Sequence, residues 1–320
     1  MDAVVIGRNE GARLLAGLEA LAGQVRRVVY VDSGSTDGSA EAAPAMGAQV
    51  VDLDLALPFT AARARNAGAS VLLAAPDAPD FLQFLDGDCA LRAGWVATAR
   101  AFMEANPQVG VVCGRRRERF PERSVYNLLC DREWDTPVGP ARACGGDALM
   151  RTTAFSAVGG FDPTFIAGEE PELCERLRRA GWQIWRLDAE MTWHDAAILR
   201  FGQWWRRSVR AGHAYAQVGA RHPSVFVADR RRIWVWGLAL PLLALVSLYV
   251  APALVAGIAL LYALSFGRVA WRFRKQGLPV AGALGCAGLI TLSKFPNLVG
   301  MATYFRRRLR GTGHRLIEYK

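Results

Sequence analysis

Residues 81–88 read Phe-Leu-Gln-Phe-Leu-Asp-Gly-Asp, an apolar run that ends in two carboxylates. The first five residues have the composition of a short buried β-strand, and the run stops at Asp86. Two carboxylates one residue apart at a strand end can hold a hard divalent cation, because Mg²⁺ typically binds one or two carboxylates together with substrate phosphates. An Asp-x-Asp triplet is more commonly a solvated turn, but its place directly after a buried strand favours a metal site at Asp86 and Asp88.

The sequence before residue 81 alternates between short β-branched runs and helical patterns. The patterns predict strands at 3–6, 27–31 and 48–51 and helices at 11–22 and 40–46. This order predicts an α/β fold with a mostly parallel, Rossmann-like sheet and right-handed crossovers. Ligands bind such sheets outside the carboxyl ends of the strands, where we expect Asp32 to lie together with Asp86 and Asp88.

Asp32 begins a cluster of turn-forming residues, Asp-Ser-Gly-Ser-Thr-Asp-Gly, at 32–38. A carboxylate at this place can accept hydrogen bonds from a base or ribose, and the loop can present backbone N–H groups to a ligand. The structural alternative is a helix N-cap, which we expect for Asp37. The two roles are compatible within one loop.

The distribution of charge excludes a soluble nucleic-acid-binding protein. The net charge is +10, but residues 1–199 carry 20 basic and 27 acidic side chains, whereas residues 200–320 carry 19 and 2. The basic third also contains Ile233–Gly267, 35 residues without Asp, Glu, Lys or Arg. A bilayer is crossed by about 20 apolar residues, so the run is long enough for two short membrane helices that turn near Ala251 and Pro252, or for one strongly tilted helix. We predict the hairpin, with basic residues that face an anionic membrane.

Four segments are therefore predicted: an α/β domain at 1–199, an amphipathic interfacial helix and basic linker at 200–232, a transmembrane hairpin at 233–267, and a basic segment at 268–320. Within the last, residues 277–305 are interpreted as interfacial or re-entrant. Basic flanks on both sides of the hairpin favour cytoplasmic ends, and residues 1–6 do not resemble a secretory signal. Six scattered cysteines without a Cys-x-x-Cys motif indicate reduced thiols. We expect a domain that faces the cytosol at the cytoplasmic (inner) membrane.

Six motifs occur in the order seen in family 2 glycosyltransferases, which the sequence resembles over roughly residues 1–195. They are Val-Ile-Gly-Arg-Asn-Glu at 5–10, Val-Asp-Ser-Gly-Ser-Thr-Asp at 31–37, Ala-Arg-Asn-Ala-Gly at 64–68, Phe-Leu-Asp-Gly-Asp at 84–88, Gly-Gly-Asp at 145–147 and Gly-Glu-Glu-Pro-Glu-Leu-Cys at 168–174. Six ordered motifs are far more specific than any one of them. The resemblance implies a GT-A fold, a nucleotide-diphospho-sugar donor and a divalent metal, Mn²⁺ or Mg²⁺.

The resemblance also implies roles for single residues of the donor site. Asp32 takes the place of the carboxylate that reads the base, and Asp86 and Asp88 take the place of the pair that contacts the ribose or sugar and ligates the metal. Further donor-site positions by resemblance are Arg8, Asn9, Arg65 and Asp147. Asp147 stands where many members have Asn, and a surface salt bridge is the structural alternative for Arg65.

The family's catalytic base lies in a Glu-Asp pair at a helix start, and this chain has Glu169 and Glu170 there. By position Glu170 replaces the Asp, and Glu169 is a competing candidate; compensation of the helix dipole is the structural alternative for both. His194 matches a histidine that can be a third metal ligand or contact the diphosphate, although a lone histidine is often structural.

Residues 203–207, Gln-Trp-Trp-Arg-Arg, partly resemble the Gln-x-x-Arg-Trp motif of processive polysaccharide synthases. Gln203 and Arg206 can therefore reach the diphosphate, or they belong to an ordinary interfacial helix. Arg207 takes the place of the tryptophan on which an acceptor sugar would stack, which argues against processivity.

The sequence thus predicts a membrane-associated inverting glycosyltransferase that acts on a lipid-linked or glycan acceptor in cell-envelope or exopolysaccharide biosynthesis. A processive polysaccharide synthase is the alternative within enzymes. An inactive nucleotide-binding membrane adaptor is the alternative of another class, and the joint presence of Asp32, Asp86, Asp88 and Glu170 argues against it.

Overall fold

The computed structural model describes residues 1–311, which form two compact units. The first unit comprises Met1–Arg119 and Asp131–Ala196. Among the described residues, the second comprises Phe120–Cys130 and 197–311. Residues 312–320, the end of the predicted segment 268–320, lie outside the described residues.

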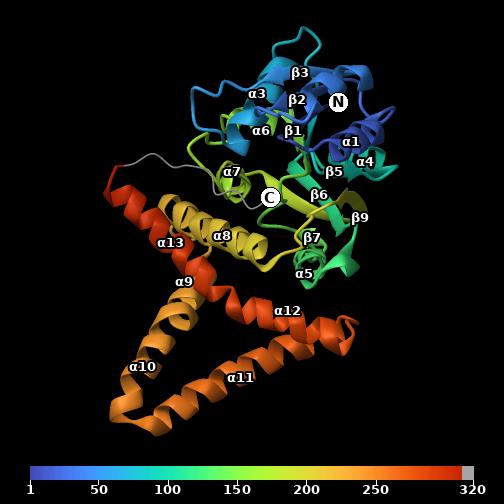
Figure 1. The fold of residues 1–320 in the computed structure, drawn as a ribbon. Helices are drawn as coiled ribbons and strands as arrows, with labels where there is room; N and C mark the ends of the chain where they lie inside the picture. The colour runs from blue at the N-terminus through green and yellow to red at the C-terminus, as the bar shows by residue number, and fades with distance from the viewer. Residues whose placement is uncertain (312–320) are drawn as a thin grey trace. The chain divides into compact units, whose positions relative to one another are not determined.

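The first unit contains a nine-stranded mixed sheet with the order β3-β2-β1-β4-β8-β6-β9-β5, and β7 pairs with β9 (Figure 1). The strands are β1 (Asp2–Gly7), β2 (Val28–Asp32), β3 (Ala48–Asp52), β4 (Phe81–Asp86), β5 (Cys89–Leu91), β6 (Val109–Glu118), β7 (Gly139–Pro140), β8 (Ala148–Arg151) and β9 (Gln183–His194). Strands β1 to β4 are parallel, as the sequence predicts. β8 runs antiparallel to β4 and β6, so the sheet beyond β4 is mixed.

Helices cover both faces of this sheet, with α3 and α6 on one side of the strands and α1 and α4 on the other (Figure 1). The first unit has α1 (Ala12–Leu21), α2 (Ser39–Ala42), the 3-10 helix η1 (Ala43–Met46), α3 (Ala61–Leu73), α4 (Trp95–Ala105), α6 (Thr152–Ala157) and α7 (Glu169–Arg179). α3 packs on β1 and β2 at a glycine, because a Cβ on Gly68 would lie 2.5 Å from Val4 Cγ1. The predicted helix at 40–46 is divided into α2 and η1, where Pro44 is at the start of the second turn.

The second unit is helical, and a segment distant in sequence completes it. Its elements are η2 (Pro121–Arg123), α8 (Phe201–Arg221), α9 (Val227–Trp234), the π-helical turn η3 (Val235–Ala239), α10 (Leu240–Val250), α11 (Pro252–Lys275), α12 (Val280–Leu292) and α13 (Lys294–Leu309), with most of α5 (Val125–Glu133). Ser124 Oγ donates to the Ile198 carbonyl at 2.6 Å, and Ile198 N–H donates to Asn127 Oδ1 at 3.0 Å. These bonds explain why residues 120–130 belong to this unit.

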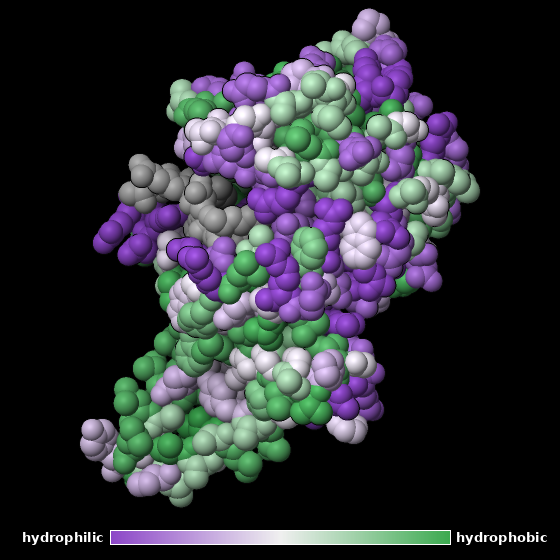
Figure 2. All heavy atoms as spheres, turned by 45° about the vertical axis from the view of Figure 1, so that its right-hand side comes forward, coloured by the Kyte–Doolittle hydropathy of each residue, from purple (hydrophilic) through white to green (hydrophobic). Residues whose placement is uncertain are grey.

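Two helical stretches of the described residues are long and apolar enough to cross a membrane, Val227–Val250 and Pro252–Lys275. Their most apolar windows are only 17% and 11% buried, unlike the core helices of a soluble protein. The chain turns between them at Ala251 and Pro252, where the sequence predicts the turn. Figure 2 shows the α10–α11 hairpin as a largely hydrophobic surface, so both stretches have the surface that lipid requires.

Helices α8 and α13 pack against each other at two glycines. A Cβ on Gly212 would lie 2.0 Å from the Asn297 carbonyl oxygen, and a Cβ on Gly300 would lie 2.0 Å from the Val209 carbonyl oxygen. Small residues at such crossings let two helix backbones approach closely. The region predicted as one interfacial segment, 277–305, thus consists of two helices, α12 and α13, of which α13 is part of a packed pair.

Candidate functional site

The carboxyl ends of β1, β2 and β4 meet at one edge of the sheet in the first unit. In the strand register Gly7 lies opposite Asp32, and Ile6 lies opposite Asp86. The parallel arrangement therefore brings the loops after these strands together, although about 50 residues of sequence separate Asp32 from Asp86. This is the edge at which the sequence predicts ligand binding.

Asp32 is buried, and its carboxylate is held by its own loop. Its Oδ1 accepts hydrogen bonds from Tyr30 Oη at 2.7 Å and Ser35 Oγ at 2.5 Å, and its Oδ2 accepts from the N–H groups of Gly34 and Ser35 at 2.8 and 2.7 Å. Burial, together with this bond to Asp32, raises the pKa of Tyr30. Asp32 therefore fixes the shape of residues 33–35, and a base that it reads would have to share these oxygens.

Asn9 connects the first loop to the second. Its backbone N–H donates to Ser35 Oγ at 2.9 Å, and its Oδ1 accepts from Thr36 N–H at 2.7 Å. Asn9 has a φ of 57°, a left-handed conformation that Asn tolerates better than most residues. Arg8 precedes Asn9 and is exposed. The two predicted donor-site residues thus lie on one surface loop, where Arg8 provides a cation and Asn9 anchors the loop.

Arg65 joins two of the predicted acidic residues. From α3, its Nη2 donates to Asp86 Oδ1 at 2.6 Å and its Nη1 donates to Glu169 Oε1 at 2.7 Å. We call Arg65, Asp86 and Glu169 the ion-pair triad. Burial would raise the pKa of Asp86, but the charge of Arg65, with weaker effects of nearby cations, lowers it to about 2. A Cβ on Gly146 would lie 2.6 Å from Arg65 and 2.7 Å from Asp86, which explains a glycine at this position.

Asp147 is fully buried and supports the end of β4. Its Oδ1 accepts the backbone N–H of Asp86 at 2.9 Å, and its Oδ2 lies 2.9 Å from Arg116 Nη2. Thr192 Oγ1 donates to the same Oδ2 at 3.2 Å. Asp147, predicted beside the donor sugar, therefore positions Asp86 and pairs with the partly buried Arg116.

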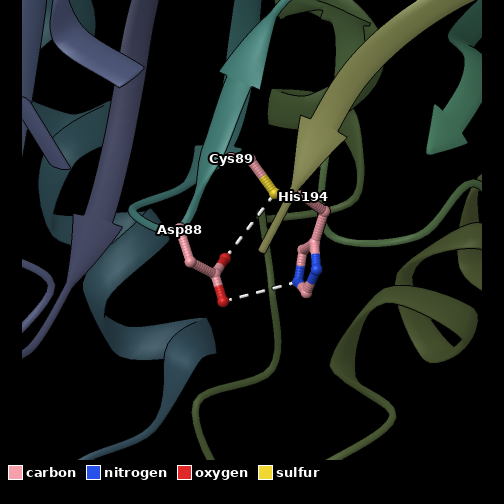
Figure 3. Close-up of side chains that lie close together, drawn as sticks. All are labelled: Asp88, Cys89 and His194. Atoms are coloured by element: carbon pink, nitrogen blue, oxygen red, sulfur yellow. Dashed lines mark hydrogen bonds and ion pairs between the residues drawn. The ribbon is translucent and has the colours of Figure 1, made fainter. Parts of the chain in front are cut away.

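Asp88 and His194 face each other, as the sequence predicts for two metal ligands (Figure 3). Their Oδ2 and Nε2 atoms lie 3.4 Å apart, and the other imidazole nitrogen, Nδ1, lies 3.6 Å from Glu118 Oε2. We call Asp88, Glu118 and His194 the Asp88–His194 cluster. Ligating histidines typically present the second nitrogen to a carboxylate, so the donors fit a divalent metal held between Asp88 and His194.

Cys89 is next to this cluster but is a poor ligand for a hard cation. Its thiol lies 3.6 Å from Asp88 Oδ1 and is directed toward it in Figure 3. Burial raises the pKa of Cys89 well above its usual value, so the thiol keeps its proton. Mg²⁺ and Mn²⁺ prefer oxygen ligands to sulfur, which leaves Asp88, Asp86 and His194 as the candidate ligands.

Three residues of the site were missed in the sequence analysis: Arg116, Glu118 and Trp134. Arg116 and Glu118 are two residues apart on β6, and such residues point to the same face of a sheet; the spacing was visible in the charged run at 115–119. Trp134 lies with its ring centroid 4.5 Å from that of His194 and 5.5 Å from Arg116 Cζ. It had no sequence signal, because only the fold brings 134 to 194.

Glu170 lies in a group of thiols. Its Oε1 accepts a hydrogen bond from the backbone N–H of Cys144 at 2.5 Å and from Cys174 Sγ at 2.9 Å. The two sulfur atoms are 3.7 Å apart. We call Cys144, Glu170 and Cys174 the thiol cluster. Glu169 and Glu170 are neighbours at the start of α7, yet the first is bound by a cation and the second by neutral donors.

Gln203 and Arg206 belong to the second unit. Gln203 Oε1 accepts the N–H groups of Leu199 and Arg200, both at 3.0 Å, and so caps the first turn of α8. Arg206 is exposed. Gln203 thus has a local structural role, whereas the diphosphate contact predicted for both residues stays a prediction.

Known proteins resemble this chain in sequence. Residues 2–152 match the family described as Glycosyl transferase family 2. Succinoglycan biosynthesis protein ExoA of Rhizobium meliloti is 32% identical over 211 residues, which cover 60% of this chain and 62% of that protein. Pre-mycofactocin glycosyltransferase of Mycobacterium tuberculosis is 29% identical over 223 residues, which cover 65% and 46%. The match thus spans less than two thirds of the length of either relative.

Solved structures share the fold. A mannosyltransferase from Pyrobaculum calidifontis, in complex with GDP-Man and Mn²⁺, has a TM-score of 0.59 at 20% identity and covers 91% of this chain and 86% of that chain. Glucosyl-3-phosphoglycerate synthase from Mycobacterium tuberculosis, in complex with Mg²⁺ and uridine-diphosphate, has a TM-score of 0.50 at 19% identity, over 69% and 79%. At these identities the likeness shows the fold alone. The predicted GT-A fold is thereby confirmed, and residues 2–152 of this chain match the family 2 glycosyltransferases.

Proposed function

We propose that this chain is a membrane-associated inverting glycosyltransferase that moves a sugar from a nucleotide-diphospho-sugar to a lipid-linked or glycan acceptor. The observation that carries the proposal is the Asp88–His194 cluster at the same sheet edge as Asp32 and Asp86. The solved relatives with GDP-Man and Mn²⁺ or with UDP and Mg²⁺ support a nucleotide donor and a divalent cation.

The metal would be held by Asp88 and His194, with Asp86 as a further carboxylate. When bound, such an ion neutralises the charge that develops on a departing diphosphate. Glu118 places a carboxylate 3.6 Å from one nitrogen of His194, whose other nitrogen faces Asp88. Arg65 restrains Asp86 through Oδ1, so the protein positions both carboxylates before a donor arrives, as preorganised catalysis requires.

Glu170 is the proposed general base. Deprotonation of an acceptor hydroxyl requires a carboxylate oxygen that can accept a proton at about 2.6–3.2 Å. Glu169 is paired with the buried cation of Arg65, whereas the bonds to Glu170 come from the neutral donors of Cys144 and Cys174. The protonated form of Glu170 needs no rearrangement of a buried ion pair, and this supports the assignment of the base to Glu170.

The two apolar stretches support a membrane location and hence an acceptor at the membrane. Arg231 and Arg232 lie near the start of the first stretch, and Arg272, Arg274 and Lys275 lie at the end of the second. Basic residues at both ends of a hairpin favour cytoplasmic ends and attract anionic headgroups. We therefore place the domain at the cytoplasmic face of the inner membrane, near a lipid-linked acceptor of cell-envelope or exopolysaccharide synthesis.

The donor proposal is tested with the full chain in detergent and a panel of nucleotide sugars with Mn²⁺ or Mg²⁺. We expect release of the nucleoside diphosphate from one donor of the panel. Loss of a residue that supports a metal ligand lowers metal affinity or activity about 10–100-fold. Asp88→Ala removes a proposed ligand itself, so it should lower activity by at least that factor. Asp188→Ala is the control, because Asp188 is 92% exposed. Full activity of Asp88→Ala, or binding of a donor without any turnover, would overturn the assignment.

The membrane proposal is tested by fractionation. The full chain should stay in the membrane pellet after an alkaline carbonate wash and enter solution only with detergent. Replacing Leu245 with Arg should weaken retention, because Arg at the centre of a membrane helix costs about 2.5–3.5 kcal/mol. Leu245 is 59% exposed, so its replacement removes little packing. Release of the unchanged chain by carbonate alone would exclude a spanning hairpin.

A further inference from the structure

The thiol cluster has the geometry of a metal site distinct from the Asp88–His194 cluster. Its three ligand atoms, two sulfurs and one carboxylate oxygen, all lie within 4.8 Å of one another, and all three residues are buried. Glu170 and Cys174 are four residues apart on α7 and so share one helix face, which Cys144 approaches from the segment before β8. We propose that Cys144, Glu170 and Cys174 bind a thiophilic divalent cation such as Zn²⁺ or Cd²⁺, and that this cation inhibits the enzyme.

The distances within the thiol cluster fit tetrahedral coordination. A Zn–S bond of about 2.3 Å at the tetrahedral angle places two sulfur ligands about 3.8 Å apart. The two sulfur atoms of the cluster are 3.7 Å apart without a metal, and Glu170 Oε1 lies 2.9 Å from Cys174 Sγ. Entry of the ion would require Oε1 and Cys174 Sγ to separate by a few tenths of an ångström, and a water molecule would complete the four ligands.

The chemistry of the ligand atoms distinguishes this site from the proposed metal site for the nucleotide-sugar donor. Two thiolates select Zn²⁺ or Cd²⁺, whereas carboxylates with one imidazole also suit Mg²⁺ and Mn²⁺. The thiol cluster has no second carboxylate and no imidazole among its three ligands. Mg²⁺ or Mn²⁺ bound at the Asp88–His194 cluster would therefore not occupy the thiol cluster.

Binding must displace the two thiol protons. Burial raises the pKa of both cysteines, so in the metal-free protein both are thiols. The balanced step is one divalent cation plus two thiols and one carboxylate, giving the bound ion and two released protons, with no change of oxidation state. Affinity should therefore increase with pH.

Inhibition rests on the proposed function, whereas metal binding does not. A cation bound to Glu170 neutralises the carboxylate that is proposed to accept the proton of the acceptor hydroxyl. Mn²⁺ at the Asp88–His194 cluster cannot relieve this, because the two ions occupy different ligands. Inhibition by Zn²⁺ should thus persist at saturating Mn²⁺.

The experiment titrates the full chain in detergent with Cd²⁺ under a non-chelating phosphine reductant, and follows the ultraviolet charge-transfer absorption of Cd²⁺–thiolate bonds. We expect one Cd²⁺ per chain with the intensity of two thiolates, and competition by Zn²⁺. Cys144→Ala and Cys174→Ala should each weaken binding at least about tenfold. Cys89→Ala is the matched control, because Cys89 is also buried but lies next to the Asp88–His194 cluster.

Two outcomes would overturn the proposal. One is an unchanged Cd²⁺ signal in the double variant Cys144→Ala/Cys174→Ala; the other is a signal that only Cys89→Ala removes, which would move the site to Asp88 and His194. Cys174→Ser replaces the alanine variant if thermal unfolding shows that the latter is destabilised, since its hydroxyl can still donate to Glu170. Cd²⁺ binding without inhibition would leave the site intact and refute Glu170 as the base.

Discussion

The Asp88–His194 cluster and the thiol cluster both bury a carboxylate in the first unit, but their surroundings differ in kind. In the first, two carboxylates flank one imidazole. In the second, a single carboxylate accepts hydrogen bonds from an N–H group and a thiol. The ion-pair triad adds a third arrangement, in which Arg65 neutralises Asp86 and Glu169. The neighbours of a carboxylate, rather than its position in a motif, therefore determine whether it suits a metal ion, a proton or a structural ion pair.

The largest effect is expected from the comparison of Glu170→Gln with Glu169→Gln. Removal of a general base costs about 10²–10⁴-fold in kcat, so Glu170→Gln should lose turnover by this factor with little change in donor KM. Glu169→Gln should mainly lower stability, because it removes one partner of Arg65. Steady-state kinetics on both variants is the measurement. If kcat falls only in Glu169→Gln, the base is Glu169. The inference that the base is the carboxylate with neutral neighbours would then be wrong.

The next effect is on stability, through Arg65→Met. Removing one partner of a buried ion pair costs about 3–5 kcal/mol, and here two carboxylates lose their cation. Arg100→Met is the control, since Arg100 and Glu104 form an exposed pair on α4 worth about 0.5 kcal/mol or less. Thermal or denaturant unfolding measures both. Equal destabilisation by the two substitutions would show that Arg65 does not hold the triad.

The pH dependence of the same variant sharpens this test. The pKa of Asp86 is lowered to about 2 in the folded chain, against about 3.9 when unfolded. A lowered folded pKa gives stability that is complete above the unfolded value and is lost as the pH falls through the folded value. The stability difference between the unchanged chain and Arg65→Met, measured in EDTA, should therefore narrow from pH 5 to pH 2. A constant difference over that range would contradict the Arg65–Asp86 pairing.

The smallest effect is expected from Glu118→Gln, which acts through His194. Loss of the carboxylate beside a ligating histidine should weaken Mn²⁺ affinity about 10–100-fold. Glu190→Gln is the control, because Glu190 pairs with Arg117 and is 40% exposed. Activity measured against Mn²⁺ concentration should show a shift that excess Mn²⁺ restores. A fall in kcat that Mn²⁺ does not restore would mean that Glu118 supports the fold and not the metal.

Much of the first unit could be predicted from sequence because it depends on local patterns. The alternation of β-branched runs and helices predicted that β1 to β4 are parallel. The turn-forming residues after these strands indicated the edge of the sheet at which we expect ligand binding. The antiparallel pairing of β8 with β4 was not predicted, because it depends on contacts between residues about 65 positions apart. In the second unit, the apolar run at 233–267 predicted the turn at Ala251, since hydrophobic length is a local property.

The sequence proposed residues for the candidate site but not their arrangement. Asp88 and His194 were predicted as metal ligands, and the structure brings them within 3.4 Å. Glu118 and Trp134 were missed, because both contact His194 only through strand register and loop placement. Arg65 was placed at the site by motif, whereas its role as a bridge required the positions of two side chains from separate elements.

The parallel α/β domain, the carboxylates at its strand ends and the two apolar stretches follow from the sequence alone, because periodicity, composition and motif order are local properties of the chain. The partner of each acidic residue, by contrast, depends on the tertiary structure. Glu169 and Glu170 are adjacent and chemically alike, but at the start of α7 they point to different neighbours, one to the guanidinium of Arg65 and the other to the thiol of Cys174. A helix turns each successive side chain by about 100°, so only the packing around that helix assigns each carboxylate its partner.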